Sequence, residues 1–466
     1  MPVAPAPDIL APVWRDLGLA PSALARLRAD GDAPVYPAHH DVAGLAQATI
    51  AGVALAASEV WRAATGAALA VRADRRHAAL EFRSERVFEV DGQPPAALWD
   101  SLAGAYRCGD GRWLRVHTNF AHHRQALCQV LDCAETPAAV TAALAGRAAG
   151  EVESAAAEAG AIAAMMRPME AWRDSAQGQA VAGLPLISLA RIGAAPKTPV
   201  RARARPLDGL KVLDLTRVIA GPVCGRVLAA HGADVLAISA PHLPSMAELT
   251  VDVGRGKRSA HLDLRADEDG RHLAALIGDA DIFVQGYRPG GLAARGFGPA
   301  AVAALKPGII YVSLSAYGHT GPWAGRRGFD SIAQTAIGLN HSEARAAGLA
   351  DQPQVLPAQA LDHASGYLMA LGALAAVLKR AQEGGSWHVQ VALARTGHWL
   401  QDLPKVTDGP AVAEPARPDD LLEESASGFG QLRALRHAGP IEGIAPWWTR
   451  PTRQPSYFMS SVSGHP

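Results

Sequence analysis

Asp362 is the residue with the clearest local setting for chemistry, within the segment Leu356–Leu393 (LPAQALDHASGYLMALGALAAVLKRAQEGGSWHVQVAL). Small and apolar residues follow it from Ala364 to Val377, and two basic residues precede Gly384-Gly385. An acid at the start, basic residues in the last turn and glycine past the end predict one helix. The alternating residues His388–Leu393 predict a strand after it. A carboxylate in this position is commonly an N-cap, so the local pattern alone favours a structural role for Asp362.

The composition excludes several classes of protein. The chain has 466 residues, 44 of them Lys or Arg and 44 Asp or Glu, so no charge excess points to nucleic acid or an anionic membrane. We expect no transmembrane helix, because no run of about 20 uninterrupted apolar residues occurs. The first residues, MPVAPAPDILAPVWRDLG, have no pattern of a signal for export. Four cysteines without CxxC or metal-ligand spacing predict reduced thiols, no metal site and a cytoplasmic protein.

A weak internal repeat links the two ends of the chain. Val42–Ala64 predicts an alanine-rich helix that Thr65-Gly66 ends, and a short apolar strand should follow. The segment after Asp362 has the same order of helix, glycine, strand and apolar segment. In the first copy, the position of Asp362 falls on or beside His40 and Asp41.

Between the two copies, the sequence predicts a hairpin with a tight turn at Asp110-Gly111. A helix follows and carries His122-His123, whose side chains should diverge by about 100° and so cannot share one metal ion. From Leu207, short apolar strands alternate with helices, which predicts an α/β fold with a Rossmann-like parallel sheet domain and a smaller α+β domain. The turn TRVIAGPVCG lacks GxGxxG, and Ser239 stands where NAD binding would require an acid, so NAD is not expected.

Six ordered blocks between Leu207 and Leu400 resemble the class III CoA-transferases, the CaiB/BaiF or formyl-CoA transferase-like family. The blocks are LDGLKVLDLTRVIAGP, HGADVLAIS, GRGKRSAHLDLR, DADIFVQGYRPGGLAARGFG, PGIIYVSLSAYGHTGPWAGRRGFDSIAQ and LDHASGYLMALGALAAVLKRAQEGG. The resemblance implies that Asp362 is a nucleophile that attacks an acyl-CoA thioester. It also implies coenzyme A as a substrate, a small carboxylic acid as acceptor, and no cofactor. A carboxylate nucleophile must be positioned and partly desolvated, and the oxyanion that it creates needs nearby N–H donors. A helix N-terminus offers such donors, as does a glycine-rich loop.

The resemblance also implies which residues contact CoA, namely Val218, Ile219, Lys257, Arg258, Gly286, Tyr287 and Arg327. Two of these depart from the family pattern, since Gly286 replaces an asparagine and Ile219 a glutamine. After the second strand, Ser239 and Ala240 replace an acidic and a basic residue. These losses put the details of the CoA contacts in question and leave open a CoA-binding paralogue without activity. A racemase of the same family is the other alternative, although its histidine is replaced here by Phe329.

The resemblance implies an unusual order of domains and a homodimer. Residues 1–35 form an extension, and residues 36–193 resemble the helix and small domain at the far end of such transferases. Residues 194–206 are a linker, an extended strap that must cross between the lobes, and residues 207–400 form the Rossmann-like domain with the nucleophile. Residues 401–466 are a Pro-rich segment, with Trp447, Trp448, Tyr457 and Phe458, that should wrap over the fold. We therefore expect residues 36–193 to complete the site beside Asp362, within one chain or across a dimer.

Overall fold

The central sheet of the computed structural model, which describes residues 3–201, 203–349 and 352–454, has seven strands in the order β10-β9-β8-β11-β12-β13-β7. Six of them pair in parallel, and β7 lies antiparallel to β13 at one edge. The strands are β7 (Ser188–Gly193), β8 (Lys211–Leu215), β9 (Asp234–Ser239), β10 (Lys257–His261), β11 (Ile282–Gln285), β12 (Ile310–Ser315) and β13 (Ser386–Ala392). The predicted α/β class is confirmed.

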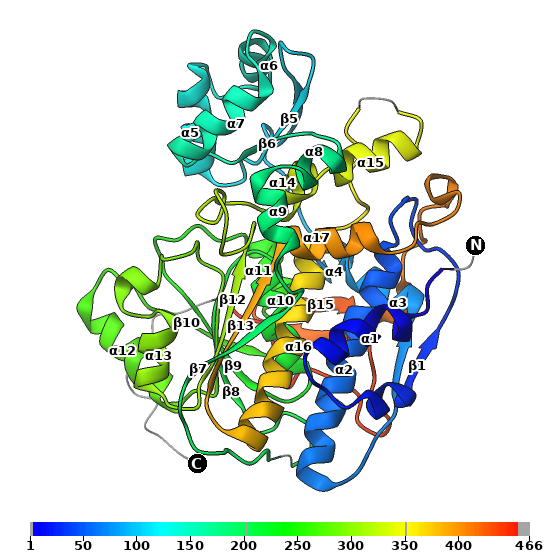
Figure 1. Cartoon of the computed structure of the whole chain (residues 1–466), viewed down its shortest axis with the longest axis vertical. Helices are drawn as coiled ribbons and strands as arrows, with labels where there is room; N and C mark the ends of the chain where they lie inside the picture. The colour runs from blue at the N-terminus through cyan, green and yellow to red at the C-terminus, as the bar shows by residue number, and fades with distance from the viewer. Residues whose placement is uncertain (1–2, 202, 350–351, 455–466) are drawn as a thin grey trace.

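Both faces of this sheet are covered, because successive strand residues enter different cores. Val212 of β8 belongs to the large core with helices α2 (Val42–Thr65), α10 (Ala220–Ala230) and α16 (Ala360–Glu383). Leu213 belongs to a second core with α12 (Asp267–Asp279) and α13 (Pro299–Leu305). This alternation is typical of a parallel sheet between two helical layers. Figure 1 shows α16 between α2 and the sheet.

Helices α2 and α16 are long and apolar enough to cross a membrane by length and composition, yet their most apolar stretches are completely buried within the fold. Their close approach to neighbours requires glycine. A Cβ on Gly366 of α16 would lie 2.4 Å from the Ala220 carbonyl oxygen of α10, and one on Gly52 would lie 2.9 Å from a Leu10 methyl group. The packing of α16 therefore fixes the start of α10 against the residues around Asp362.

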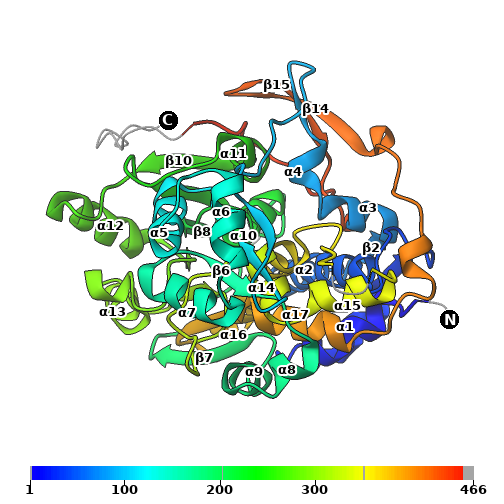
Figure 2. The same cartoon turned by 90° about the horizontal axis from the view of Figure 1, so that it is seen from above.

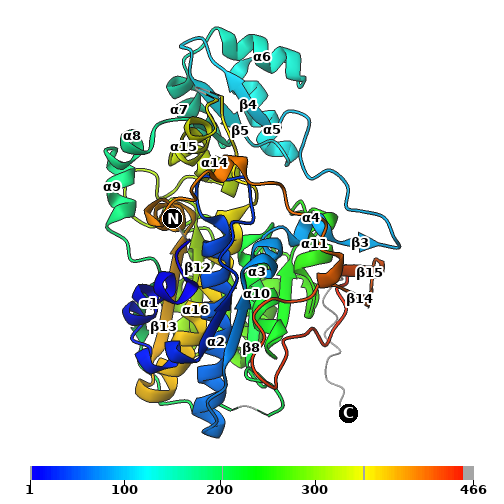
Figure 3. The same cartoon turned by 90° about the vertical axis from the view of Figure 1, so that its right-hand side faces the viewer.

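The N-terminal region repeats the order of elements around α16. Helix α2 spans 24 residues and is followed by β2 (Val71–Asp74) and α3 (Arg75–Glu81), just as α16 spans 24 residues and is followed by β13 and α17 (Leu393–Asp402). β2 pairs in parallel with β1 (Leu27–Asp30). Before them lie α1 (Ala6–Asp16) and the 3-10 helix η1 (Pro21–Arg26), and α4 (Ser84–Val87) follows. The predicted repeat is therefore present in the fold, and its two long helices, α2 and α16, lie side by side (Figure 3).

The expected counterpart of Asp362 in this repeat was wrong. Asp362 is the third residue of α16, and the third residue of α2 is Gly44, not His40 or Asp41. Asp41 caps α2 by accepting the Gly44 N–H at 2.8 Å and forms a buried ion pair with Arg75. The first copy thus has no carboxylate at the matching position.

A small lobe lies over the carboxyl ends of the sheet strands (Figures 1 and 2). It contains β4 (Gly104–Arg107), β5 (Trp113–Val116), β6 (Ala163–Met165), α5 (Ala121–Leu131), α6 (Pro137–Ala145) and α7 (Ala149–Ala159), around its own core. The predicted hairpin is confirmed, with Gly111 at φ 76°. Of the predicted segment 36–193, helix α2 packs in the large core and β7 joins the central sheet, outside this lobe.

The remaining segments connect these parts. Helices α8 (Met169–Arg173) and α9 (Ala176–Ala182) return from the lobe, and residues 194–206 pass the end of α16, where the Gly385 N–H donates to the Ala195 carbonyl at 2.9 Å. The other elements are α11 (Ala247–Val253), α14 (Asp330–Ala336), α15 (Leu339–Ala346), η2 (Ala293–Arg295), η3 (Gly409–Ala411) and η4 (Asp419–Leu421).

The C-terminal segment returns across the fold. Its strands β14 (Leu422–Ser427) and β15 (Gly430–Leu435) form a sheet with β3 (Glu89–Val90) of the N-terminal region. Further on, the Trp447 N–H donates to the Ala230 carbonyl at the end of α10. The predicted wrapping segment therefore does lie over the fold as far as residue 454, whereas Tyr457 and Phe458 fall outside the described residues.

Candidate active site

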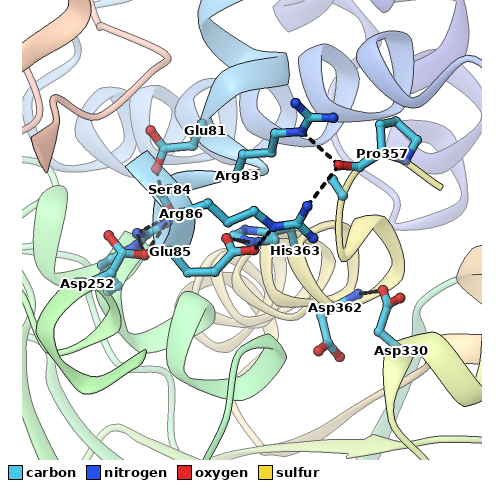
Figure 4. A network of polar contacts seen from close by, with 12 residues as sticks. Glu81, Arg83, Ser84, Glu85, Arg86, Asp252, Asp330, Pro357, Asp362 and His363 are labelled. Atoms are coloured by element: carbon cyan, nitrogen blue, oxygen red, sulfur yellow. Dashed lines mark hydrogen bonds and ion pairs between the residues drawn. The ribbon is translucent and has the colours of Figure 1, made fainter. Parts of the chain in front are cut away.

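Asp362 lies in the first turn of α16 but does not cap it. The N-cap residue is Gln359, whose side chain makes no capping bond. The cap is supplied instead by Asp330, at the start of α14, whose Oδ2 accepts the N–H groups of Leu361 at 2.7 Å and Asp362 at 2.9 Å (Figure 4). The N-cap interpretation of Asp362 is therefore corrected. The Asp362 carboxylate is left without a hydrogen bond to the described part of the chain, so it is available for chemistry.

Burial makes the charge of this carboxylate costly. Asp362 is 6% exposed, and burial, followed by the charges of Asp330 and Glu85, raises its pKa well above 3.8. Burial also raises the pKa of Asp330, to about 6, although the two backbone N–H bonds and the Gln334 amide oppose that shift. Two carboxyl groups this close repel each other as anions, so the pair holds a proton more readily than isolated acids do. A desolvated carboxylate is the stronger nucleophile once it is ionised.

The N-terminal region fixes the start of α16 from the other side. Glu85 of α4 is fully buried, and its Oε2 lies 3.0 Å from His363 Nε2. Burial acts to raise the pKa of Glu85, but the His363 hydrogen bond and the charges of His363 and Arg86 lower it. Arg86 donates from Nε to Glu85 Oε1 at 3.1 Å, and both Arg83 and Arg86 donate to the Pro357 carbonyl just before α16 (Figure 4).

A buried ion network anchors these residues to the sheet domain. Arg226 of α10 pairs with Glu81 of α3 at 3.0 Å and with Asp252 of α11 at 2.6 Å, and all three side chains are fully buried. Ser84 donates to Asp252 at 2.7 Å. Because a buried charge without its partner is strongly destabilising, this network holds residues 81–86 in register with α10. The expectation that the N-terminal region lies beside Asp362 is met here within one chain.

A cavity of about 370 Å³ opens beside Asp362 at the carboxyl ends of the strands. Six of the eight residues that the sequence assigned to the site line it together: Asp362, Val218, Ile219, Gly286, Tyr287 and Arg327. Ligands of open parallel sheets bind at this edge. A second cavity of about 670 Å³ shares Leu243, Tyr287 and Arg288 with the first, so the binding space extends along the sheet edge.

Lys257 and Arg258 are not brought into this cavity. The Lys257 ammonium is buried, and it donates to Asp214 Oδ2 at 2.8 Å and to the Pro222 carbonyl at 2.7 Å. It lines a neighbouring cavity of about 470 Å³. Arg258 pairs with Asp234 at 2.7 Å on the surface. Both side chains therefore hold strands and helices together, and their assignment to CoA stays a prediction without support from the geometry.

The backbone at the start of α10 is strained where it meets the cavity. Val218 has φ 74°, a left-handed conformation that a β-branched residue adopts at a cost of about 1–3 kcal/mol. Ile219 is the N-cap of α10, and residues 218–220 all line the cavity with Asp362. A helix start leaves backbone N–H groups without intrahelical partners. The structure thus places the start of α10 at the same cavity as Asp362.

Sequence reasoning missed most of the positive charge at this cavity. Arg217, Arg288 and Arg326 also line it. Within the described residues, neither Arg217 nor Arg327 pairs with an acid; each donates to a backbone carbonyl, of Pro244 and Gly160 respectively. Burial, and then Arg288, lowers the pKa of Arg327. The signal was present in the arginines of the turns YRPGG and GRRG, which had no periodicity to explain them.

Three histidines of the small lobe were also not assigned to the site. His122 and His123 line the cavity, and their ring centroids lie 3.9 Å apart, so the prediction that they diverge was wrong. His117 of the same lobe stacks on Phe329 with centroids 3.9 Å apart and planes 9° apart. Burial lowers the pKa of His117 to about 4, so its ring is neutral at pH 7. The neutral imidazole of His117 therefore lies against the ring of Phe329.

Comparison with known proteins relates this part of the chain to a described family. Residues 207–427 match the family model described as CoA-transferase family III. Acetyl-coenzyme A transferase nodX of Hypoxylon pulicicidum is 39% identical over 210 residues, which cover 44% of this chain and 35% of the relative. Probable fatty acyl-CoA transferase Rv3272 of Mycobacterium tuberculosis is 34% identical over 216 residues, which cover 44% of this chain and 54% of the relative.

Among solved structures, a CAIB/BAIF family protein from Brucella suis has 27% sequence identity and a TM-score of 0.37. The match covers 49% of this chain and 65% of that chain. The chain spans between about a third and about half of the length of the two curated relatives.

Proposed function

We propose that this protein moves CoA from an acyl-CoA to a carboxylic acid, with Asp362 as the nucleophile and coenzyme A as a substrate. The observation that carries the proposal is the buried carboxylate of Asp362, free of hydrogen bonds to the described chain, at the end of a cavity with several arginines. Arginine guanidinium groups bind phosphate and pyrophosphate well. The family-model match of residues 207–427 and the names of the two relatives support this assignment.

The proposed reaction proceeds by four acyl transfers. The ionised Asp362 attacks the thioester carbonyl carbon, the C–S bond breaks, and CoA thiolate leaves a mixed anhydride on Asp362. The thiolate attacks the Asp362 carbonyl carbon, which releases the donor acid and forms an aspartyl-CoA thioester. The acceptor carboxylate attacks this thioester and expels the thiolate again. Attack of the thiolate on the acceptor carbonyl then forms the new acyl-CoA and frees Asp362.

The chain's residues have separate parts in this scheme. Asp330 holds the first turn of α16 and so aims Asp362. In this proposal the backbone N–H groups at the start of α10 stabilise each oxyanion. Arg217, Arg288 and Arg327, which line the cavity, bind the CoA phosphates. Glu85 and His363 keep the N-terminal region against α16, which keeps water from the anhydride.

The test is a transferase screen of acyl-CoA donors against carboxylate acceptors, read by mass spectrometry of the CoA esters formed. Wild type should form new esters, and Asp362→Ala should form none while keeping its circular dichroism spectrum. Binding of CoA without transfer across all pairs would favour a CoA-binding paralogue. Full activity of Asp362→Ala would refute the assignment of the nucleophile.

A racemase is the second candidate, and one observation favours it. His117 brings a neutral imidazole to Phe329, the position where the sequence lacks the family's histidine, and it lines a small cavity with Asp362. Exchange of an α-proton needs two bases about the same carbon. Deuterium from solvent should then enter the α-carbon of a 2-methylacyl-CoA, and its absence would exclude this activity. We also propose a homodimer, which sedimentation of the full chain tests.

A further inference from the structure

Lys257 has a buried ammonium group that the transfer scheme leaves without a part. Its side chain pairs with that of Asp214 at 2.8 Å, and both side chains are buried. Lys257 begins β10, whereas Asp214 lies near the end of β8, so the lysine reaches across β9, which separates these strands in the sheet. The same ammonium donates to the Pro222 carbonyl, in the first turn of α10, at 2.7 Å. One buried cation therefore joins the end of a strand to the start of a helix.

The turn between β8 and α10 is held at both of its ends by this ion pair. Before the turn, Asp214 Oδ1 accepts the Thr216 N–H at 3.1 Å and also the Thr216 hydroxyl. After the turn, Lys257 holds the Pro222 carbonyl. The two ends meet closely, since a Cβ on Gly221 would overlap the Thr216 side chain. The ion pair therefore closes the turn.

Val218 lies inside this turn in the left-handed conformation, with φ 74°. A β-branched side chain disfavours that conformation, so the backbone keeps it only where surrounding contacts impose it. The pair of Lys257 and Asp214 supplies such contacts on both sides of Val218. Residues 216–220 line the same cavity as Asp362, so the conformation of Val218 sets part of the wall of that cavity.

Stability alone does not account for a buried ion pair at this place. Hydrophobic residues of similar volume often stabilise a protein as well as a buried pair does, or better. A cation at the first turn of a helix also opposes the helix dipole. Direct binding of CoA lacks support as well, because Lys257 lines a neighbouring cavity and its ammonium already has two acceptors.

We propose that Lys257 is a positioning residue for CoA transfer, because together with Asp214 it holds the turn at Val218 and keeps the start of α10 at the cavity of Asp362. The inference rests on the proposed function. In that scheme the backbone N–H groups at the start of α10 stabilise the oxyanion, so a loosened turn weakens the transition state more than the binding of acyl-CoA. Loss of the lysine should therefore lower kcat and leave KM nearly unchanged.

A double variant separates this role from a purely structural one. Lys257→Met alone leaves the buried Asp214 charge unpaired and should destabilise the fold. Lys257→Met combined with Asp214→Asn removes both charges, and the amide oxygen at position 214 can still accept the Thr216 bonds. This double variant should fold, with kcat at least tenfold lower and KM for acyl-CoA within about twofold of wild type.

The matched control is Lys306→Met. Its ammonium also donates to a backbone carbonyl, that of Gly278 at 2.8 Å, but at the opposite edge of the sheet, before β11 and β12 begin. This control should keep the kcat and KM of wild type. A folded double variant that also keeps the kcat and KM of wild type would overturn the inference and leave Lys257 a structural role alone.

An acyl-CoA and the matching acyl-dephospho-CoA, which lacks the 3′-phosphate, distinguish positioning from phosphate binding. The double variant should keep the wild-type ratio of the KM values for these two substrates. If Lys257 contacted the phosphate, the double variant would lose the wild-type discrimination, and KM would rise while kcat stayed unchanged. That result would overturn the inference.

Amide hydrogen exchange gives an outcome that does not depend on turnover. In the full chain, the N–H groups of residues 215–224 should exchange at least tenfold faster in the double variant than in wild type or in Lys306→Met, because the turn opens more often. Equal exchange would overturn the inference and leave the proposed function standing. Absence of transfer by wild type from every donor would refute the proposed function, whereas faster exchange would still show that Lys257 holds the turn.

Discussion

Replacement of Asp362 by asparagine should stabilise the protein at neutral pH while it abolishes transfer. Burial and the neighbouring acids raise the pKa of Asp362 above 3.8. A carboxyl whose pKa is higher in the folded state contributes stability that is fully present below its unfolded pKa. That contribution is lost as the pH rises through the folded pKa. The ionised Asp362 therefore costs stability at pH 8 and not at pH 4.5, and the asparagine variant avoids this cost.

The size of the effect follows from the partner carboxyl. The rise of the Asp330 pKa from 3.8 to about 6 corresponds to about 3 kcal/mol, at 1.36 kcal/mol for each pKa unit. The pKa of Asp362 is shifted in the same direction, by burial and by the charges of Asp330 and Glu85, so removal of its charge should also stabilise the fold. The entropy of unfolding, about 2.1 cal/mol/K per residue, gives about 1 kcal/mol/K for the 466 residues. The variant should thus melt higher than wild type at pH 8, by about 1 °C for each kcal/mol that the loss of the charge contributes.

Differential scanning calorimetry between pH 4.5 and pH 8 measures this difference. The gain in Tm should be smallest at pH 4.5 and should grow as the pH rises through the raised folded pKa of Asp362. Asp16→Asn is the control, because Asp16 is an exposed acid whose side chain is 67% accessible, and its Tm should follow wild type. A variant at Asp362 that is equally stable or less stable at pH 8 would refute the reasoning that this carboxylate is desolvated and repelled.

Three other changes test the surroundings of the nucleophile. Asp330→Ala removes the acceptor of the two backbone N–H groups at the start of α16 and should lower kcat by at least tenfold. Unchanged kcat would mean that the cap does not position Asp362. Gly366→Ala places a methyl group 2.4 Å from the Ala220 carbonyl oxygen. The free energy of unfolding in urea should fall by about 1–3 kcal/mol, and an unchanged value would contradict this close contact. Arg327→Gln should raise KM for acyl-CoA about tenfold with kcat within about twofold, and a fall in kcat alone would place Arg327 outside phosphate binding.

Expression of residues 1–200 and 201–466 as separate chains tests the dependence of the two halves. Neither should fold alone, because the buried Arg226 of the second half pairs with the buried Glu81 of the first. Each half alone leaves one of these charges unpaired. Two soluble, folded halves that do not associate would show that the N-terminal region is an appended domain.

Patterns of short range predicted much of the fold. Glycine and basic residues around the apolar run predicted the end of α16, and alternating strands and helices from Leu207 predicted the parallel sheet. These features depend on periodicity and on caps, which neighbouring residues determine. The repeat was visible for the same reason, but its register was not. Gly44 is the equivalent of Asp362 in the repeat, and this follows only from the boundaries of the two helices.

Contacts of long range account for what the sequence did not predict. Asp330 caps α16 across 32 residues, and Glu85 meets His363 across 278 residues, so no local pattern could distinguish a cap from a free carboxylate at Asp362. Lys257 was assigned to CoA from its place in a motif, yet Asp214 holds its ammonium inside the fold. His117 was not assigned any role, because only the folded small lobe stacks it on Phe329.

The central claim is that Asp362 forms a covalent thioester with CoA. Incubation of the full chain with an acyl-CoA that the transferase screen identifies as a donor, followed by borohydride reduction and peptide mass spectrometry, measures this directly. Borohydride reduces an aspartyl thioester to an alcohol, so the peptide that contains Asp362 should lose 14 mass units, and the Asp362→Asn protein should show no such change. Reduction at a different carboxylate, or transfer of CoA with Asp362 unmodified throughout turnover, would contradict the account.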